Sequence, residues 1–491
     1  MLNQEKIRKE KLKNIKLLGI DPYPNLNLKL NYNIKKILNN KKKILNKKKK
    51  IYISGRIFNI RIMGKSTFLD IKDFTDKKIQ LYYNIKNIDL KYRKKKYYIF
   101  LFKKYLDIGD IIWIKGFLFL TKVKEFTILI KKIILLSKCI YPLPNEKIKN
   151  NKKYYEFQNL EKRYRMRYLD LILNYKNKKK FILKALIINY IRKFLNKFNY
   201  IEVDTPILQN IPGGATAKPF KTFHNKFKKK FYLRISNELY LKKLIVGGFK
   251  GVFEFSKNFR NESIDKNHNP EFTILEFYVT YKNYIWMMKF LHKMLIYICK
   301  KTFKKTKIKI ENFFINFKKK IKKIKLFDFI KKKTKFNINE KTTLKKLIKI
   351  SKKLKIKIKK KKKDKIIDNI FNKFCKNKIK YPIFITDYPV YMSPLAKRKK
   401  KNKNLTERFE LYINKMEIAN AYTELNNPIE QLKRFKKQKK NKIDKDFIKS
   451  LKIGMPPTVG IGIGIERLIS LLTNSINIQE IIFFPQMKEK N

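Results

Sequence analysis

Acidic residues, histidine, cysteine and glycine are scarce in this chain of 491 residues. It has 38 Asp and Glu against 123 Lys and Arg, so its formal net charge is +85 at pH 7. The three cysteines, Cys139, Cys299 and Cys375, stand apart, without a Cys-x-x-Cys pair or a neighbouring His. Neither a disulfide framework nor a structural zinc site is therefore indicated, and we expect a reducing, cytoplasmic setting.

Long apolar runs are also missing. No stretch of about 18 apolar residues is present, and the start "MLNQEKIRKEKLKNIKLLGIDPYPN" has no apolar segment followed by small residues. We therefore expect a soluble, unprocessed protein with no membrane partner.

The excess of basic residues permits a nucleic-acid partner, because clustered Lys and Arg neutralise phosphates. Lys, Ile, Asn, Phe and Tyr are enriched together, however, which is typical of an A+T-rich genome. The charge alone therefore does not distinguish function from mutational bias.

Composition and periodicity divide the chain into three parts. Residues 1–50 read as a basic helical extension that ends in "NNKKKILNKKKK". Five short alternating runs then predict a five-stranded barrel of the OB type, an oligonucleotide-binding fold, over residues 51–145. On it Phe68, Tyr82 and Phe119 could stack bases and Gln80 could read a base edge, although each aromatic alone is more simply a core residue.

The remainder, residues 154–491, reads as one large unit of helices and strands. A helical period over 178–198 is followed by "NYIEVDTPIL", a strand that Pro206 ends. Residues 300–380 form a Lys-rich insertion, mostly helical in period, with no chemical motif.

The first polar cluster lies in "FRNESIDKNHNPEFTILEFY", residues 259–278, where two predicted strands flank a polar loop. Arg260 and Glu262 are expected to share one strand face, and Glu276 and Tyr278 another. With His268 and Phe272, this set has the parts that grip a nucleotide. A surface salt-bridge network is the alternative.

The second cluster, "ERFELYINKMEIANAYTELNNP" at 407–428, predicts a hairpin that turns at Asn414–Lys415. One face of its second strand would carry Asn420, Tyr422 and Glu424. Glu417 joins that face only if a bulge intervenes. Carboxylates from both strands, Glu410 among them, would suit Mg²⁺, which takes one or two carboxylates plus substrate phosphates.

The third stretch, "GMPPTVGIGIGIERLISLLTNS", alternates glycine with branched apolar residues. One strand face is thus stripped of side chains at Gly460, Gly462 and Gly464, which lets a flat ligand approach. Arg467 falls in the first turn of the following helix, where anions are favoured. The period-two glycines are not the dinucleotide-binding fingerprint.

Together these stretches, with "NYIEVDTPIL", resemble in order and content the three motifs of class II aminoacyl-tRNA synthetases. "RYRMRYLDLI", "IPGGATAKPF", "LRISNELYLKKLIVGG", "ITDYPVYMSPLAK" and "SGRIFNIRIMGKSTFLDIKD" are most similar to the lysyl-tRNA synthetases, from about residue 50 to the end and weakest over 300–380. The resemblance implies an α+β fold: an anticodon-binding OB barrel, then a catalytic domain whose antiparallel sheet is flanked by helices. It also implies a homodimer.

The activity implied is that of an ATP-dependent ligase that activates L-lysine and transfers it to the 3′ end of tRNA(Lys). The lysine contacts carried over are Gly214, Glu238, Arg260, Glu276, Tyr278, Asn420 and Glu424. The ATP contacts are Arg260, Glu262, His268, Phe272, Glu410 and Arg467, with adenine and the α-phosphate region between Phe272 and Arg260. The Mg²⁺ ligands are Glu410 and Glu417, the groups acting in catalysis Arg260, Arg467 and Glu417, and the anticodon contacts Phe68 and Gln80.

Departures from the family pattern are mild, except that a barrel position usually held by glutamate is Lys132. Two alternatives remain at this stage. An aspartyl- or asparaginyl-tRNA synthetase would need a cation for the substrate side chain where Glu424 and Tyr278 stand. A non-catalytic RNA-binding relative would not need Arg260, Glu410, Glu417 and Arg467 together.

Overall fold

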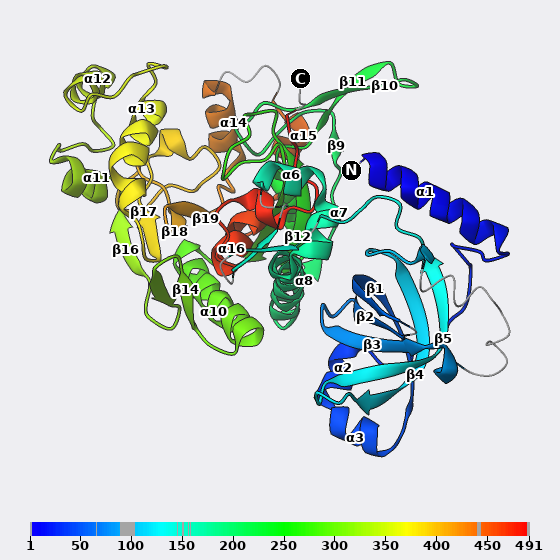
Figure 1. Cartoon of the computed structure of the whole chain (residues 1–491). Coiled ribbons are helices and arrows are strands. Elements are labelled where there is room, and N and C mark those ends of the chain that lie inside the picture. The colour runs from blue at the N-terminus through cyan, green and yellow to red at the C-terminus, as the bar shows by residue number, and fades with distance from the viewer. Residues whose placement is uncertain are drawn as a thin grey trace. The chain divides into compact units, whose positions relative to one another are not determined.

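The chain divides into two units, Met1–Lys162 and Arg163–Asn491 (Figure 1). The computed structural model describes residues 2–64, 66–88, 104–144, 146–149, 152–155, 157, 159–438 and 443–488. Among these residues, no helix combines the length and the apolar character that crossing a membrane requires.

A closed five-stranded barrel forms the body of the first unit. Its strands are β1 (Lys50–Met63), β2 (Ser66–Lys72), β3 (Lys78–Asn84), β4 (Ile111–Leu120) and β5 (Phe126–Ser137), in the order β1-β2-β3-β5-β4. Residues alternate between interior and surface, so that Ile51, Ile53 and Ile57 of β1 are buried. The predicted OB barrel is confirmed.

Three helices precede the barrel: α1 (Leu2–Leu17), α2 (Ile34–Asn39) and α3 (Lys41–Asn46). Asn33 caps α2, because its side chain accepts from the Lys36 N–H. Ile15, Ile34 and Ile44 belong to the same buried cluster as the barrel interior. The basic N-terminal segment therefore contributes to the core of this unit.

An eight-stranded sheet organises the second unit. Its strand order is β16 (Lys322–Lys325), β17 (Ile383–Thr386), β18 (Arg408–Ile413), β19 (Met416–Thr423), β20 (Thr458–Gly464), β13 (Glu271–Thr280), β12 (Gly251–Phe259) and β8 (Ile201–Glu202). The pairs from β17 to β12 are antiparallel, as predicted, whereas β16 runs parallel to β17 and β8 parallel to β12.

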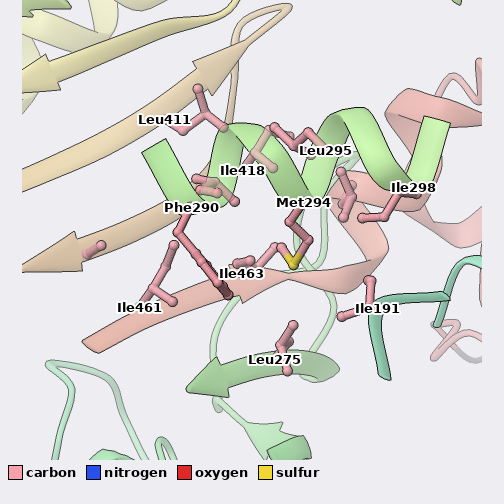
Figure 2. Packing of buried hydrophobic residues seen from close by; sticks show 14 of the residues in the cluster. Ile191, Leu275, Phe290, Met294, Leu295, Ile298, Leu411, Ile418, Ile461 and Ile463 are labelled. Atoms are coloured by element: carbon pink, nitrogen blue, oxygen red, sulfur yellow. The ribbon is translucent and has the colours of Figure 1, made fainter. Parts of the chain in front are cut away.

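Helices cover one face of this sheet and leave the other for the site. α8 (Tyr175–Asn196), α10 (Tyr284–Phe303) and α16 (Ile465–Leu472) share one apolar cluster with every second residue of the central strands, such as Leu275 and Ile463 (Figure 2). Because successive strand residues point to opposite faces, the residues in between, such as Glu276 and Gly462, face away from these helices.

The β12–β13 hairpin has the predicted two strands with a polar loop. β12 ends at Phe259, however, so Arg260 and Glu262 lie in the loop, and the prediction that they share a strand face is wrong. The Glu262 N–H instead donates to the Arg260 carbonyl at 2.8 Å. Loop geometry, rather than strand alternation, therefore places these two side chains.

The β18–β19 hairpin turns at Asn414 and Lys415, as predicted. Both have positive φ, 45° and 65°, and Ile413 pairs with Met416, which makes a two-residue turn of the type that matches strand twist. A register shift opposite Leu411 and Tyr412 leaves Ile418 as an extra residue. This bulge is the one that brings Glu417 into phase with Asn420.

The Lys-rich insertion has its own core. The hairpin of β14 (Lys307–Ile310) and β15 (Phe313–Asn316) precedes α11 (Leu326–Thr334), α12 (Leu344–Lys353) and α13 (Lys363–Ile370). The three helices bury Ile330, Leu347 and Ile367 together. The segment is therefore helical in its larger part, but its first strands were not predicted.

Further helices and strands follow Asn159 in the chain. They are α6 (Leu160–Arg165), α7 (Arg167–Leu173), β9 (Leu208–Gln209), β10 (Lys221–His224), β11 (Lys229–Leu233), α9 (Glu238–Val246), α14 (Pro428–Lys437) and α15 (Lys445–Ile453).

Candidate active site

A cavity of about 480 Å³ opens on the polar face of the sheet. Strands β13, β19 and β20, the loop after β12 and the start of α9 supply its walls. The predicted site residues that line it are Gly214, Glu238, Arg260, Glu262, His268, Phe272, Glu276, Tyr278, Asn420, Glu417 and Arg467. Glu410 and Glu424 are not among its lining residues, and Phe68 and Gln80 lie on the barrel.

One end of the cavity is acidic. The Tyr278 hydroxyl donates to Glu276 Oε2 at 3.2 Å, and the Ser236 hydroxyl donates to Glu276 Oε1 at 3.3 Å. The Tyr422 hydroxyl donates to Glu238 Oε1 at 2.7 Å. Glu238 also forms an ion pair with Lys242, whereas the hydrogen bonds of Glu276 come from neutral hydroxyl groups. This wall therefore favours a cation, because a buried charge needs a partner.

Glu424 lies directly behind this wall. Its side chain is 1% exposed, and its Oε2 forms an ion pair with Lys242. Its Oε1 is buried without a hydrogen-bond partner among the described residues. A Cβ on Gly460, which lines the cavity, would come within 2.3 Å of that oxygen. Glu424 therefore borders the cavity at the glycine strand, with one oxygen still to be satisfied.

Burial, and after it the neighbouring Glu238, raise the pKa of Glu276 to about 8, against the hydrogen bond from Tyr278. At neutral pH this carboxyl therefore keeps its proton. An incoming ammonium group favours the charged carboxylate, so ligand binding at this end is coupled to proton release.

We expect the affinity for a cationic ligand to rise with pH up to about 8, by at most about tenfold per pH unit, because one carboxyl must lose its proton. The contribution of Glu276 to the free energy of unfolding depends on pH in the opposite direction. Glu276 binds its proton more tightly when folded, so its contribution is complete below pH 4.5 and is lost as the pH rises towards 8. Calorimetric titration with lysine from pH 6 to pH 9 checks this, and a flat affinity would contradict it.

The other end of the cavity is cationic. The Arg260 guanidinium lies over the Phe272 ring, 5.0 Å from its centroid. In this arrangement the two side chains contact each other, so a base could lie between them only after they moved apart, and the sandwich of adenine by Phe272 and Arg260 stays a prediction. The Arg260 Nε is buried without a partner among the described residues, which leaves a donor free for an anionic ligand.

A hydrogen-bonded chain continues from this end. Arg467 donates from Nη2 to His268 Nε2 at 3.0 Å, and the His268 Nδ1 lies 2.8 Å from Asp265. Arginine only donates, so His268 Nε2 accepts and the proton resides on Nδ1. Arg467 also pairs with the Glu417 carboxylate at 3.5 Å. Arg467 starts α16 as predicted, and its guanidinium is positioned by partners on two other elements.

The two predicted metal ligands differ in their surroundings. The Glu410 carboxylate accepts from Arg408 at 2.5 Å, Tyr388 at 2.7 Å and Tyr412 at 2.8 Å. Both of its oxygens are therefore occupied. Glu417 lines the cavity and is half-buried. Within the described part of the chain, no cluster of three or more His, Cys, Asp or Glu side chains could hold a metal ion.

Sequence reasoning missed three residues of this site: Arg408, Tyr422 as a hydrogen-bond donor, and Lys242. Arg408 lies two residues before Glu410 on β18, so strand alternation could have placed it on the same face. Lys242 follows Glu238 by four residues on α9, a spacing that brings side chains together.

On the barrel, three rings form a half-buried row outside the core cluster. Phe68 and Tyr82 have centroids 5.0 Å apart, and Tyr82 and Phe119 5.9 Å apart. Gln80 is buried, and its Oε1 accepts from the Thr127 hydroxyl at 2.9 Å. The rings thus remain candidates for base stacking, while Gln80 already has an internal partner.

Comparison with known proteins identifies the class. The family described as tRNA synthetases class II (D, K and N) matches residues 159–488, and an OB-fold nucleic acid binding domain matches residues 51–136. The chain therefore belongs to the class II tRNA synthetases.

Within this class the similarity extends over the full length. The chain is 46% identical to the lysine–tRNA ligase of Azobacteroides pseudotrichonymphae over 99% of both chains. It is 44% identical to that of Wigglesworthia glossinidia brevipalpis over 100% of both. It is also 46% identical to that of Christiangramia forsetii over 99% of this chain and 86% of the other. The branch it joins is that of the lysine–tRNA ligases, and the resemblance read from the motifs is confirmed.

Proposed function

We propose that the cavity binds L-lysine and ATP, forms lysyl-adenylate and transfers lysine to the 3′ end of tRNA(Lys). The observation that carries this proposal is the polarity of the cavity. Glu238 and Glu276 stand at one end, with the free Glu424 oxygen behind them, and Arg260 and Arg467 stand at the other. Lysine has two ammonium groups and one carboxylate, so it matches an acidic end that leads to a cationic one.

In the reaction, a lysine carboxylate oxygen attacks the α-phosphorus of ATP, the bond to the bridging oxygen breaks, and pyrophosphate leaves with the electron pair. A terminal hydroxyl of tRNA then attacks the lysyl carbonyl and AMP leaves. The chain supplies no nucleophile. Arg260 would hold the lysine carboxylate near the α-phosphate, and Arg467, oriented by His268, would neutralise phosphate charge.

Mg²⁺ fits this site in part. Glu417 presents a carboxylate to the cavity, and one carboxylate with ATP phosphates is a common donor set for this ion. Glu410 would join only if Arg408 released it. When bound, the ion would supply charge neutralisation on the phosphates. We therefore propose that Glu417 binds Mg²⁺ and that Glu410 positions Arg408.

The sibling activities are disfavoured by the same polarity. An aspartate or asparagine side chain would meet Glu276, Tyr278 and Glu424 where a cation or amide donor is needed. Amino-acid-dependent exchange of pyrophosphate into ATP, measured with all twenty amino acids, tests the proposal. Exchange with lysine is expected. Exchange with aspartate or asparagine instead, or with none, would overturn it.

We propose that the barrel binds the anticodon through the row of Phe68, Tyr82 and Phe119. Phe68→Ala is expected to raise the KM for tRNA by roughly 5- to 150-fold, because one base–ring stack contributes about 1–3 kcal/mol. Pyrophosphate exchange without tRNA should not change. Phe74→Ala, which removes an exposed ring from the same barrel, serves as the control. A loss of exchange in Phe68→Ala would make Phe68 a structural residue.

We also propose a homodimer. Several apolar side chains in the middle of α8 and beyond its end are exposed, namely Ile182, Leu186, Ile201, Ile207 and Leu208. Exposed apolar surface of this kind is typical of subunit contacts. Sedimentation at micromolar concentration should give twice the chain mass, and Leu186→Glu should shift the protein towards monomer. A monomeric unaltered protein would contradict the proposal.

A further inference from the structure

Lys242 is a buried cation to which the proposed function assigns no part. It lies in α9, is 1% exposed, and does not line the cavity. Its ammonium group forms ion pairs with both Glu238 and Glu424. One of these carboxylates borders the cavity from α9 and the other from the end of β19. A single internal ammonium group therefore joins two acids that come from different elements.

Aromatic rings complete the surroundings of this ammonium group. Its Nζ lies 5.6 Å from the ring centroid of Tyr422, 5.9 Å from Phe447 and 6.0 Å from Tyr278. Ring faces at such distances attract cations. Although burial lowers the pKa of Lys242, the two carboxylates outweigh it and raise the pKa above its ordinary value. Lys242 is therefore charged at every pH at which the protein would work.

The acidic end of the cavity has more carboxyl groups than the two ammonium groups of a lysine molecule can pair with. Glu238, Glu276 and Glu424 are three carboxylates. A fourth nearby acid, Glu254, is balanced by Arg234 at 2.7 Å. Lys242 balances one of the remaining three, and two carboxyl groups are left, of which Glu276 keeps its proton until a cation binds. A free lysine molecule brings two ammonium groups.

We infer that Lys242 is a positioning residue that sets the charge of the amino-acid pocket. Its ammonium group holds Glu238 and Glu424 together and balances one carboxylate, which leaves two for the ammonium groups of the substrate. This inference rests on the proposed lysine specificity and extends it, because it makes recognition depend on a residue that does not line the cavity.

Removal of the Lys242 charge should change the protonation of the pocket, which a loss of packing alone would not do. Burial, the largest cause, raises the pKa of Glu424 well above its ordinary value, and the ion pair with Lys242 opposes that rise in part. Without the ammonium group that rise is unopposed, so Glu424 holds a proton more firmly near neutral pH, and lysine must displace that proton in order to bind. The titratable groups around the Lys242 ammonium group are the carboxyl groups of Glu238, Glu276 and Glu424 and the neutral hydroxyl groups of Tyr278 and Tyr422.

The test is calorimetric titration of L-lysine into the full-length protein in two buffers that differ in ionisation enthalpy, which counts the protons released. Lys242→Met is expected to bind lysine at least tenfold more weakly at pH 7 and to release up to one more proton per lysine than the unaltered protein. The deficit should shrink as the pH is raised towards 9. ATP binding should not change.

Two further variants separate charge from other roles. Lys242→Gln keeps a hydrogen-bond donor without the charge and is better tolerated in a polar site, so it should show the same added proton. Lys243→Gln is the matched control, since the neighbouring Lys243 pairs with the exposed Asp446 on the surface. It should behave as the unaltered protein does.

The outcomes are distinct. If Lys242→Gln restored normal binding, or if the variants lost affinity by the same factor at every pH with no change in proton count, the inference would be overturned while the proposed function stood. If the unaltered protein bound no lysine, the proposed function would fall and this inference with it.

Discussion

Glu424→Gln is expected to raise the KM for lysine by roughly 30- to 4,000-fold in pyrophosphate exchange. The substitution keeps the shape of the side chain but removes its charge, and truncating one partner of a buried charge pair costs roughly 2–5 kcal/mol. Glu424 is 1% exposed, and its Oε1 has no partner among the described residues, so solvent cannot replace the lost interaction. The KM for ATP should change little, because the nucleotide would bind at the opposite end.

Glu417→Gln provides the matched comparison. It removes a carboxylate from the same strand, but from the end of the cavity where Arg467 lies. Here kcat and the use of Mg²⁺-ATP should fall, with a smaller effect on lysine. An unchanged lysine KM in Glu424→Gln would contradict the assignment of this residue to the ε-ammonium group, even if the class II fold stood.

Gly460→Ala is the second substitution with a large expected effect. A methyl group there would come within 2.3 Å of both Glu424 Oε1 and Tyr278 Cε1. Both side chains are buried, so neither can move aside freely. We expect a loss of roughly 1–3 kcal/mol in the free energy of unfolding, as for other overpacked cores. We also expect the lysine KM to rise about tenfold or more, because a loss of only about 1.4 kcal/mol in the binding free energy of lysine weakens binding tenfold.

Gly464→Ala is the control for that substitution. It lies four residues further along the same strand face, but its added methyl group would meet only Arg467 at 3.6 Å, an ordinary contact distance. The lysine KM should not change. The free energy of unfolding is measured by denaturant titration and the KM by exchange. Equal effects of the two variants would show that the glycine strand needs flexibility along its length rather than space at Gly460.

Most of the secondary structure around the site could be predicted, because it depends on local patterns. Asn414 and Lys415 were identified as the hairpin turn, and the alternation after Thr458 as a strand that leads into a helix. The end of β12 was misplaced, because the alternating pattern continues past Phe259 while the ladder does not. The edge strand β8 falls within the strand predicted for "NYIEVDTPIL", whereas β16 was not predicted, since it is short and pairs with β17, which is distant in sequence.

The sequence identified the site residues by type, but it did not identify the partner of each side chain. A carboxylate at Glu410 reads as a metal ligand in sequence, yet Arg408, Tyr388 and Tyr412 occupy it in the structure. Arg260 and Phe272 were assigned to opposite faces of a base, yet they stack on each other. Such contacts depend on side-chain rotamers and loop paths, which no periodicity encodes.

The sequence by itself determined the class of this protein, its barrel and sheet, and the set of charged residues at its cavity, because motif order and strand alternation are local properties. Only the tertiary structure decided the charge balance of the pocket. Glu238 and Glu424 are 186 positions apart, and they share one ammonium group because α9 packs beside the end of β19. A buried carboxylate acquires its pKa from such neighbours, and these are set by packing rather than by sequence distance.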